Sequence, residues 1–105
     1  AYGHTARVAE HVAEGARELA TVSLLSISEM ESPEFWAALD AADAIIFGAP
    51  TYLGSVSAPF KMFMDAASRR WLAQAWRNKI AAGFTNSGAY DGDRLSTLMQ
   101  LSVYA

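Results

Sequence analysis

The sequence predicts a single domain of the α/β class, in which helices cover both faces of a parallel sheet. The chain has 105 residues, which suits one small domain. Hydrophobic residues make up 52% of it, so it can bury a core. Segments with helical spacing of apolar residues alternate with short segments that are β-branched or continuously apolar. That alternation is typical of a parallel sheet.

Charge and cysteine content exclude several classes of function. The net charge of -3 gives neither the basic surface of a nucleic-acid-binding protein nor a polybasic patch for membranes. The chain has no Cys, which excludes disulfides, thiolate metal sites and thiol catalysis. No apolar run is long enough to span a bilayer, and no signal peptide is visible. We expect a cytoplasmic protein without a metal site.

The first half of the chain predicts two helices and two strands. Residues 5–19 form the first helix, whose apolar face holds Val8, Ala9, Val12, Ala13, Ala16 and Leu19. Residues 21–27 are short and β-branched, which favours a strand. A second helix begins at Ser32-Pro33-Glu34, runs to about Ala42, and buries Phe35, Trp36 and Leu39. Residues 44–50, AIIFGAP, form a continuous apolar run, which predicts a strand covered on both faces.

The second half predicts two more helices around a third strand. Pro59 opens a helix whose inward side chains are Phe60, Phe63, Met64 and Ala67. Residues 79–85 read as a short buried strand, and residues 94–104 as a helix with Leu95, Leu98 and Met99 facing inward. The stretches 51–58 and 86–93 carry turn residues and are expected to be loops.

Three loops are expected at the carboxyl ends of the strands, where ligands of open α/β sheets bind. They are residues 1–5, 50–57 and 86–93, and all are rich in Gly, Ser, Thr, Asn and Tyr. In the first loop, Gly3 allows close approach of an anion to the helix N-terminus, where the Thr5 hydroxyl can donate. The alternative is that Thr5 only caps the helix. His4 can line such a site without doing chemistry, whereas His11 suits a surface position.

The other two loops offer flat side chains and flexible turns. In the second, Pro50 stiffens the strand exit, Tyr52 can stack on a ring, and Gly54 permits a turn with positive φ. In the third, Gly88, Gly92 and Tyr90 can clamp the other edge of the ring. The alternatives are an ordinary strand-to-helix connection and a solvated turn. Because parallel strands end at one edge, we expect the three loops to converge.

At this point the residues resemble a known family. YGHT opening a helix, then FGAPTYLGSVSAPFKMFMD, then AGFTNSGAYDGD resembles the flavodoxin-like NAD(P)H:quinone oxidoreductases of the WrbA type and the related FMN reductases. The resemblance implies FMN and NAD(P)H as cofactors. It implies that the phosphate is held by Tyr2, Gly3, His4 and Thr5. It also implies that the ribityl chain and flavin ring lie against Pro50, Thr51, Tyr52, Leu53 and Gly54. The other side of the ring is closed by Asn86, Ser87, Gly88, Ala89, Tyr90, Asp91 and Gly92.

The resemblance also raises expectations about assembly. Trp71 matches an aromatic position near a neighbouring subunit's flavin, although Ser68-Arg69-Arg70 replaces the Gly-rich approach to it. The alternative is a Trp that packs at a helix end. A homodimer or homotetramer is expected. The family's sheet has five strands, of which this chain supplies three, without the first and last. We therefore expect an incomplete flavodoxin-like domain over residues 1–105, completed by a larger chain or by another one.

Three functions remain open at the sequence level. The first is an FMN-dependent oxidoreductase that passes a hydride from NAD(P)H through the flavin to a small quinone-like acceptor. It needs no side-chain acid or base, and we assign no catalytic residue. The second is a flavodoxin-type single-electron carrier, which the mild net charge of -3 disfavours. The third is a cofactor-free flavodoxin-like binding module.

Overall fold

The computed structural model describes residues 3–90 and 92–105. In chain order its elements are α1 (His4–Arg17), the 3₁₀ turn η1 (Ile27–Glu29), α2 (Pro33–Ala41), β1 (Ala44–Tyr52), β2 (Ser55–Val56), α3 (Ala58–Ala66), α4 (Ser68–Ala73), β3 (Ile80–Asn86) and α5 (Arg94–Tyr104). The predicted α/β class is confirmed. The helix predicted from Pro59 is interrupted at Ala67, which separates α3 from α4.

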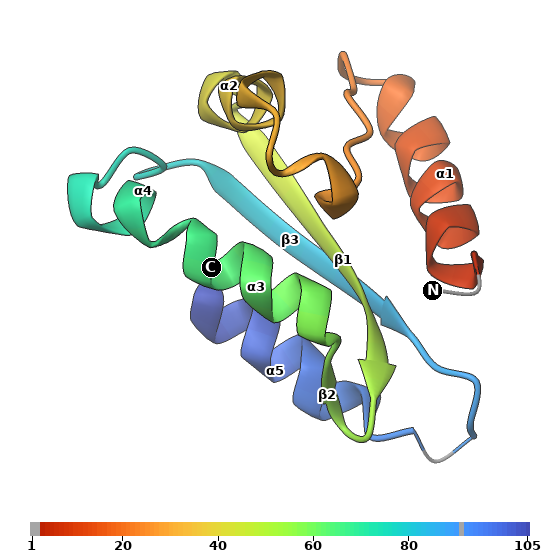
Figure 1. The fold of residues 1–105 in the computed structure, drawn as a ribbon. Coiled ribbons are helices and arrows are strands. Elements are labelled where there is room, and N and C mark those ends of the chain that lie inside the picture. The colour runs from red at the N-terminus through yellow and green to blue at the C-terminus, as the bar shows by residue number, and fades with distance from the viewer. Residues whose placement is uncertain (1–2, 91) are drawn as a thin grey trace.

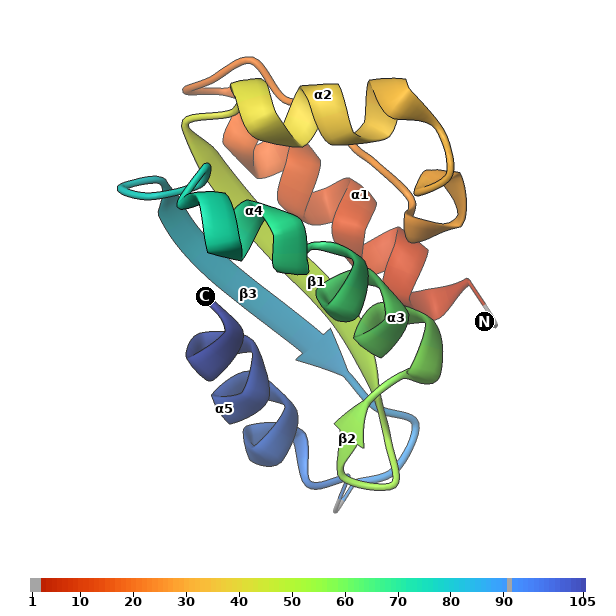
Figure 2. The same cartoon turned by 60° about the vertical axis from the view of Figure 1, so that its left-hand side comes forward.

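The sheet is built on one long parallel pair. Strand β1 pairs with β3 from Ala44 opposite Ile80 to Pro50 opposite Asn86, and the short β2 pairs antiparallel with the end of β1. Helix α1 lies on one face of the pair, and α3 and α5 lie on the other (Figures 1 and 2). The parallel pair brings the carboxyl ends of β1 and β3 to the same edge.

The strand predicted at residues 21–27 is not formed. Residues 21–26 have no regular structure, and η1 begins at Ile27. A strand is stable only when a neighbour pairs with its backbone. Among the described residues, no strand lies beside this segment. The β-branched composition was therefore an insufficient signal.

The core lies between β1 and the helices on one face of the sheet. Its buried members are Phe35, Leu39, Ile45, Phe47, Ala49, Phe60, Phe63 and Leu101. Buried residues alternate with more exposed ones along β1, and Ile46 on the other face is 46% exposed. Strand β3 is exposed along its first four residues. The predictions that residues 44–50 are covered on both faces and that residues 79–85 form a buried strand are therefore wrong for the described chain, in which α1 covers only part of the second face.

Two helix faces also differ from the prediction. Leu19 lies past the end of α1 and is 95% exposed. In α5 the buried residues are Thr97 and Leu101, whereas the expected Leu95 and Met99 are largely exposed. The face of α5 that packs on the strands includes the polar residue Thr97. Apolar spacing alone therefore predicted the wrong face of this helix.

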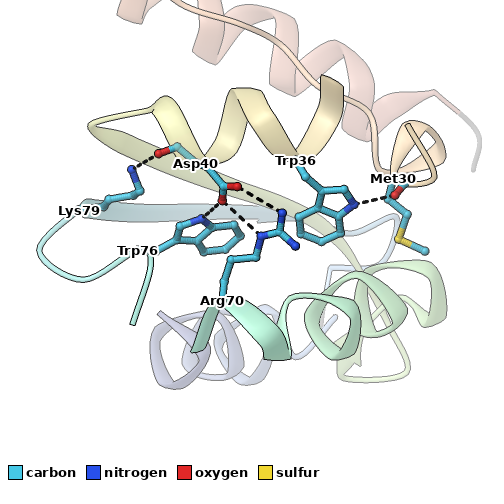
Figure 3. Close-up of polar contacts among 6 residues, drawn as sticks. All are labelled: Met30, Trp36, Asp40, Arg70, Trp76 and Lys79. Carbon is cyan, nitrogen blue, oxygen red and sulfur yellow. Dashed lines mark hydrogen bonds and ion pairs between the residues drawn. The ribbon is translucent and has the colours of Figure 1, made fainter. Parts of the chain in front are cut away.

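A polar cluster joins α2 to the segment that leads into β3, near the amino ends of the strands (Figure 3). The Arg70 guanidinium donates two hydrogen bonds of 3.2 Å to the Asp40 carboxylate, and Trp76 Nε1 donates a third at 2.7 Å. The same guanidinium lies 4.4 Å from the Trp36 ring centre. Lys79 Nζ donates to the Asp40 carbonyl at 2.9 Å. These contacts hold α4 against α2, far along the strands from the three loops.

Arg70 lies in the stretch Ser68-Arg69-Arg70 that precedes Trp71, and its side chain contacts α2 through this cluster. Trp71 itself is 72% exposed on α4, so it does not pack at a helix end. Trp36 and Trp76 are the indoles that pack, with ring centres 6.5 Å apart. A role for Trp71 toward a neighbouring subunit stays a prediction.

Candidate functional site

The first and third loops meet through a direct hydrogen bond. Thr5, in the first turn of α1, donates from Oγ1 to Oδ1 of Asn86 at 2.7 Å. Asn86 ends β3 and lies opposite Pro50 of β1 in the parallel register. The second loop therefore leaves β1 beside the same residue. All three predicted loops converge at the carboxyl edge of the sheet.

The first loop presents a helix N-terminus. Gly3 adopts φ 82°, a left-handed conformation that favours glycine, and α1 begins at His4 directly after it. No side chain among the described residues caps the helix, so its first N–H groups lack an internal partner there. His4 is exposed. Such an end attracts an anion such as a phosphate.

The second loop is a hairpin, which corrects the prediction of an irregular loop over residues 51–58. Strand β1 continues to Tyr52, and Leu53 and Gly54 form a two-residue turn with φ values of 49° and 75°. Positive φ at both turn residues matches the twist of a hairpin. The turn leaves Leu53 fully exposed and Tyr52 44% exposed. Both residues lie at the exposed end of the hairpin.

The third loop is held by polar contacts within itself. The Arg94 guanidinium donates to the carbonyls of Ala89 and Tyr90 at 3.0 and 3.2 Å, and Ser87 Oγ accepts from Ala89 N at 3.2 Å. A Cβ at Gly92 would lie 2.7 Å from Ser87 Cβ and 3.2 Å from the Ala89 carbonyl oxygen, so this fold of the loop favours glycine there. Tyr90 is 98% exposed and free to present its ring face.

The remaining predicted site residues are distributed unevenly. Tyr2 and Asp91 lie outside the described residues. Gly88 and Ala89 are exposed, and Pro50 is half-buried. Thr51 is 7% exposed and points into the protein, where its hydroxyl meets those of Thr85 and Thr97. The Thr51 side chain therefore connects β1 to β3 and α5 inside the protein.

Sequence reasoning missed four residues that support the loops, namely Thr85, Arg94, Thr97 and Gln100. Gln100 Oε1 accepts from Ser55 Oγ at 3.0 Å and from Val56 N at 3.3 Å. The spacing of Thr97, Gln100, Leu101 and Tyr104 is helical, and it would have identified this face if polar residues had been admitted to it. An apolar pattern alone excludes them.

Among the residues that the structure describes, the groups with shifted pKa values lie away from the three loops. Hydrogen bonding from Arg70 lowers the pKa of Asp40, and the Ser32 hydroxyl lowers the pKa of Glu34. Burial raises the pKa of Tyr104 to about 12. Within residues 3–90 and 92–105, no three His, Asp or Glu side chains gather where they could hold a metal ion, and no helix is long and apolar enough to cross a membrane.

The chain is similar to known flavoproteins. Residues 1–104 match the model of a family described as NADPH-dependent FMN reductase. Flavodoxin FldP of Pseudomonas aeruginosa is 48% identical over 99% of this chain and 55% of its own length. An NAD(P)H dehydrogenase (quinone) of Syntrophobacter fumaroxidans is 33% identical over 97% of this chain and 61% of its own length.

A solved structure agrees with these relatives. The WrbA-like flavodoxin structure from Agrobacterium tumefaciens superposes with a TM-score of 0.91 at 50% identity, covering all of this chain and 66% of that one. The flavodoxin-like fold is therefore confirmed. The chain spans little more than half the length of the curated relatives it matches.

Proposed function

This chain belongs to the NADPH-dependent FMN reductase family, and from that premise we propose that its three converging loops bind FMN in an oxidoreductase. The electron donor is NAD(P)H and the acceptor is a small quinone-like molecule. The single observation that carries the proposal is the Thr5–Asn86 hydrogen bond at the end of the parallel pair. It joins a helix N-terminus to the loops that carry exposed aromatic rings.

The residues at this edge fit the parts of FMN. The open N-terminus of α1, with Gly3 before it, suits the phosphate because unpaired N–H groups and the helix dipole favour an anion. Tyr52 and Tyr90 offer flat faces to the ring from the second and third loops. Hydroxyl and amide groups of Asn86 and Ser87 suit the polar ribityl chain and pyrimidine edge.

In the proposed reaction the cofactor and the protein have different roles. Bound FMN would supply the hydride and electron chemistry. The chain's own groups would orient the cofactor, donate hydrogen bonds from loop N–H groups, and keep one ring face open for the other substrate. No described side chain is assigned to proton transfer. Assembly into a homodimer or homotetramer remains part of this proposal.

The first test is an FMN titration that follows flavin fluorescence as protein is added. We expect quenching with micromolar or tighter affinity, and then oxidation of NADH or NADPH that depends on added benzoquinone. A Thr5→Val variant should bind more weakly, while the matched Thr21→Val variant should bind as the parent does, because Thr21 lies in the exposed segment outside the site. An absence of quenching both by this chain and by a chain extended with the missing first strand would leave the cofactor-free module.

The relative that is 48% identical and named a flavodoxin favours a second candidate, a single-electron carrier. Both candidates predict FMN binding, so the titration does not separate them. Oxidation of NAD(P)H does. A carrier loaded with FMN would not oxidise NAD(P)H by itself, and would do so only when a separate flavodoxin reductase is added.

A further inference from the structure

A chain of three hydroxyl groups lies beneath the proposed FMN site. It joins Thr51 at the end of β1, Thr85 near the end of β3, and Thr97 in α5. The Thr51 and Thr85 oxygens are 2.7 Å apart, and Thr51 donates to Thr97 at 2.8 Å. Thr97 has no exposed surface, and Thr51 is 7% exposed. Thr97 of α5 is thus bonded directly to the end of β1, and through Thr51 it is linked to the end of β3.

The single proton of the Thr51 hydroxyl limits the hydrogen bonds that this side chain can donate. A threonine hydroxyl has one proton to donate. Because Thr51 gives that proton to Thr97, its contact with Thr85 must be one in which Thr85 donates. No proton then remains on Thr51 for a ligand. Thr51 therefore contributes to a cofactor site by keeping the end of β1 in position. This requires Thr97 to accept the Thr51 hydrogen bond.

A second residue of α5 also forms hydrogen bonds with the same hairpin. Gln100, one turn after Thr97, accepts from Ser55 Oγ at 3.0 Å and from the Val56 backbone N–H at 3.3 Å. Thr97 therefore bonds to Thr51 in the first strand of the hairpin, and Gln100 bonds to Ser55 and Val56, which form its second strand β2. The turn at Leu53 and Gly54 lies between these two points.

We propose that Thr97 and Gln100 are positioning residues for FMN, which fix the hairpin of residues 51–56 against the ends of β1 and β3. This inference rests on the proposed function. Neither side chain is a ligand of the cofactor. Because hydrogen bonds to two residues of α5 hold the hairpin, loss of the bond to Thr97 or of the bonds to Gln100 should let Tyr52 move relative to Asn86 while α5 itself remains folded.

The test uses Thr97→Val, which keeps the shape and removes the acceptor, and Thr97→Ser, which keeps the hydroxyl. Thr21→Val repeats the same chemical change on an exposed residue as the control. One lost buried hydrogen bond should raise the FMN Kd about three- to tenfold in Thr97→Val. Thr97→Ser should restore binding to within about twofold of the parent. Equal Kd values for parent, Val and Ser variants would overturn the proposal.

A second readout separates positioning from general stability. Amide NMR shifts of the FMN-free protein should change at residues 52–54 and 86 in Thr97→Val and return in Thr97→Ser. If Thr97→Val does not fold, Gln100→Leu serves instead, and it should shift the amides of residues 53–56 and weaken FMN binding. Shifts confined to α5 in either variant would contradict positioning.

The two readouts also separate this inference from the proposed function. If FMN binds neither to the parent chain nor to the chain extended with the missing first strand, the proposed function fails, whatever the NMR shows. If the parent binds FMN while the variants bind as tightly and leave the hairpin amides unmoved, only the inference fails. A fall in the affinity of Thr97→Val that Thr97→Ser does not rescue would also count against it, because a hydroxyl at position 97 would then not be sufficient to hold the hairpin.

Discussion

The Thr5 hydroxyl donates to the Asn86 side-chain oxygen at 2.7 Å, across 81 positions of sequence. This bond is the direct link between the helix that begins the chain and the loop that follows β3. It also commits the only proton of the Thr5 hydroxyl. A phosphate at the N-terminus of α1 would compete with Asn86 for that proton, so ligand binding and the joining of the loops are coupled through these two residues.

That coupling predicts non-additive mutations. In the FMN-free protein, Thr5→Ala and Asn86→Ala should each lower the free energy of unfolding, whereas the double variant should lose less than the sum. The difference should be about 0.5–1 kcal/mol, which is typical of one partly buried hydrogen bond. Urea unfolding of all four proteins measures it. Strict additivity would show that the bond contributes nothing in solution.

A second prediction concerns the close approach of β1 and β3. A Cβ at Gly48 would lie 2.2 Å from the Phe84 ring, so Gly48→Ala must push that ring aside. We expect a loss of about 1–3 kcal/mol in the free energy of unfolding. The loss should be smaller in a Phe84→Leu background. Gly15→Ala in α1, where a Cβ meets nothing within 4 Å, is the control and should not destabilise the protein.

A third prediction is the acid sensitivity of the cluster in Figure 3. Hydrogen bonding from Arg70 lowers the pKa of Asp40 below its ordinary value of 3.8. A carboxyl whose pKa is lowered by folding stabilises the protein above its unfolded pKa, and that stability is lost as the pH falls through the folded value. Asp40→Asn should therefore flatten the fall in stability between about pH 5 and pH 2.

The size of this effect is modest because the Asp40 side chain is 43% exposed. After allowance for solvent screening, we expect about 1 kcal/mol at neutral pH. Urea unfolding at several pH values measures it, with Asp65→Asn as the control, since Asp65 pairs with Lys61 on the exposed surface of α3. Parallel pH profiles for the parent and Asp40→Asn would refute the assignment.

A fourth prediction addresses the third loop. Arg94 donates to the carbonyls of Ala89 and Tyr90, and an uncharged Met cannot replace these bonds. Arg94→Met should raise the FMN Kd roughly threefold, as expected for exposed hydrogen bonds, with little change in unfolding. Arg77→Met removes an exposed Arg outside the three loops and is the matched control. Faster proteolysis near residue 90 in Arg94→Met alone would identify loop opening as the cause.

Much of the fold could be predicted because its signals are local. Pro33 and the apolar spacing of Phe35 and Leu39 located α2. The apolar run 44–50 located β1, although alternate burial of its residues could not be read from a run without polar positions. Segment 21–27 failed for the opposite reason. Its composition favours a strand, but a strand also needs a partner, and a partner is not a local property.

The sequence by itself determined the three candidate loops, because turn residues mark where each element ends, and glycine is favoured at positive φ, as at Gly3 and Gly54. Only the tertiary structure decided which polar groups meet there. The pairing of Thr5 with Asn86, and of Thr51 with Thr85 and Thr97, joins residues from distant elements through contacts a few ångströms long. A hydrogen bond depends on distance and direction in space, and spacing along the chain specifies neither.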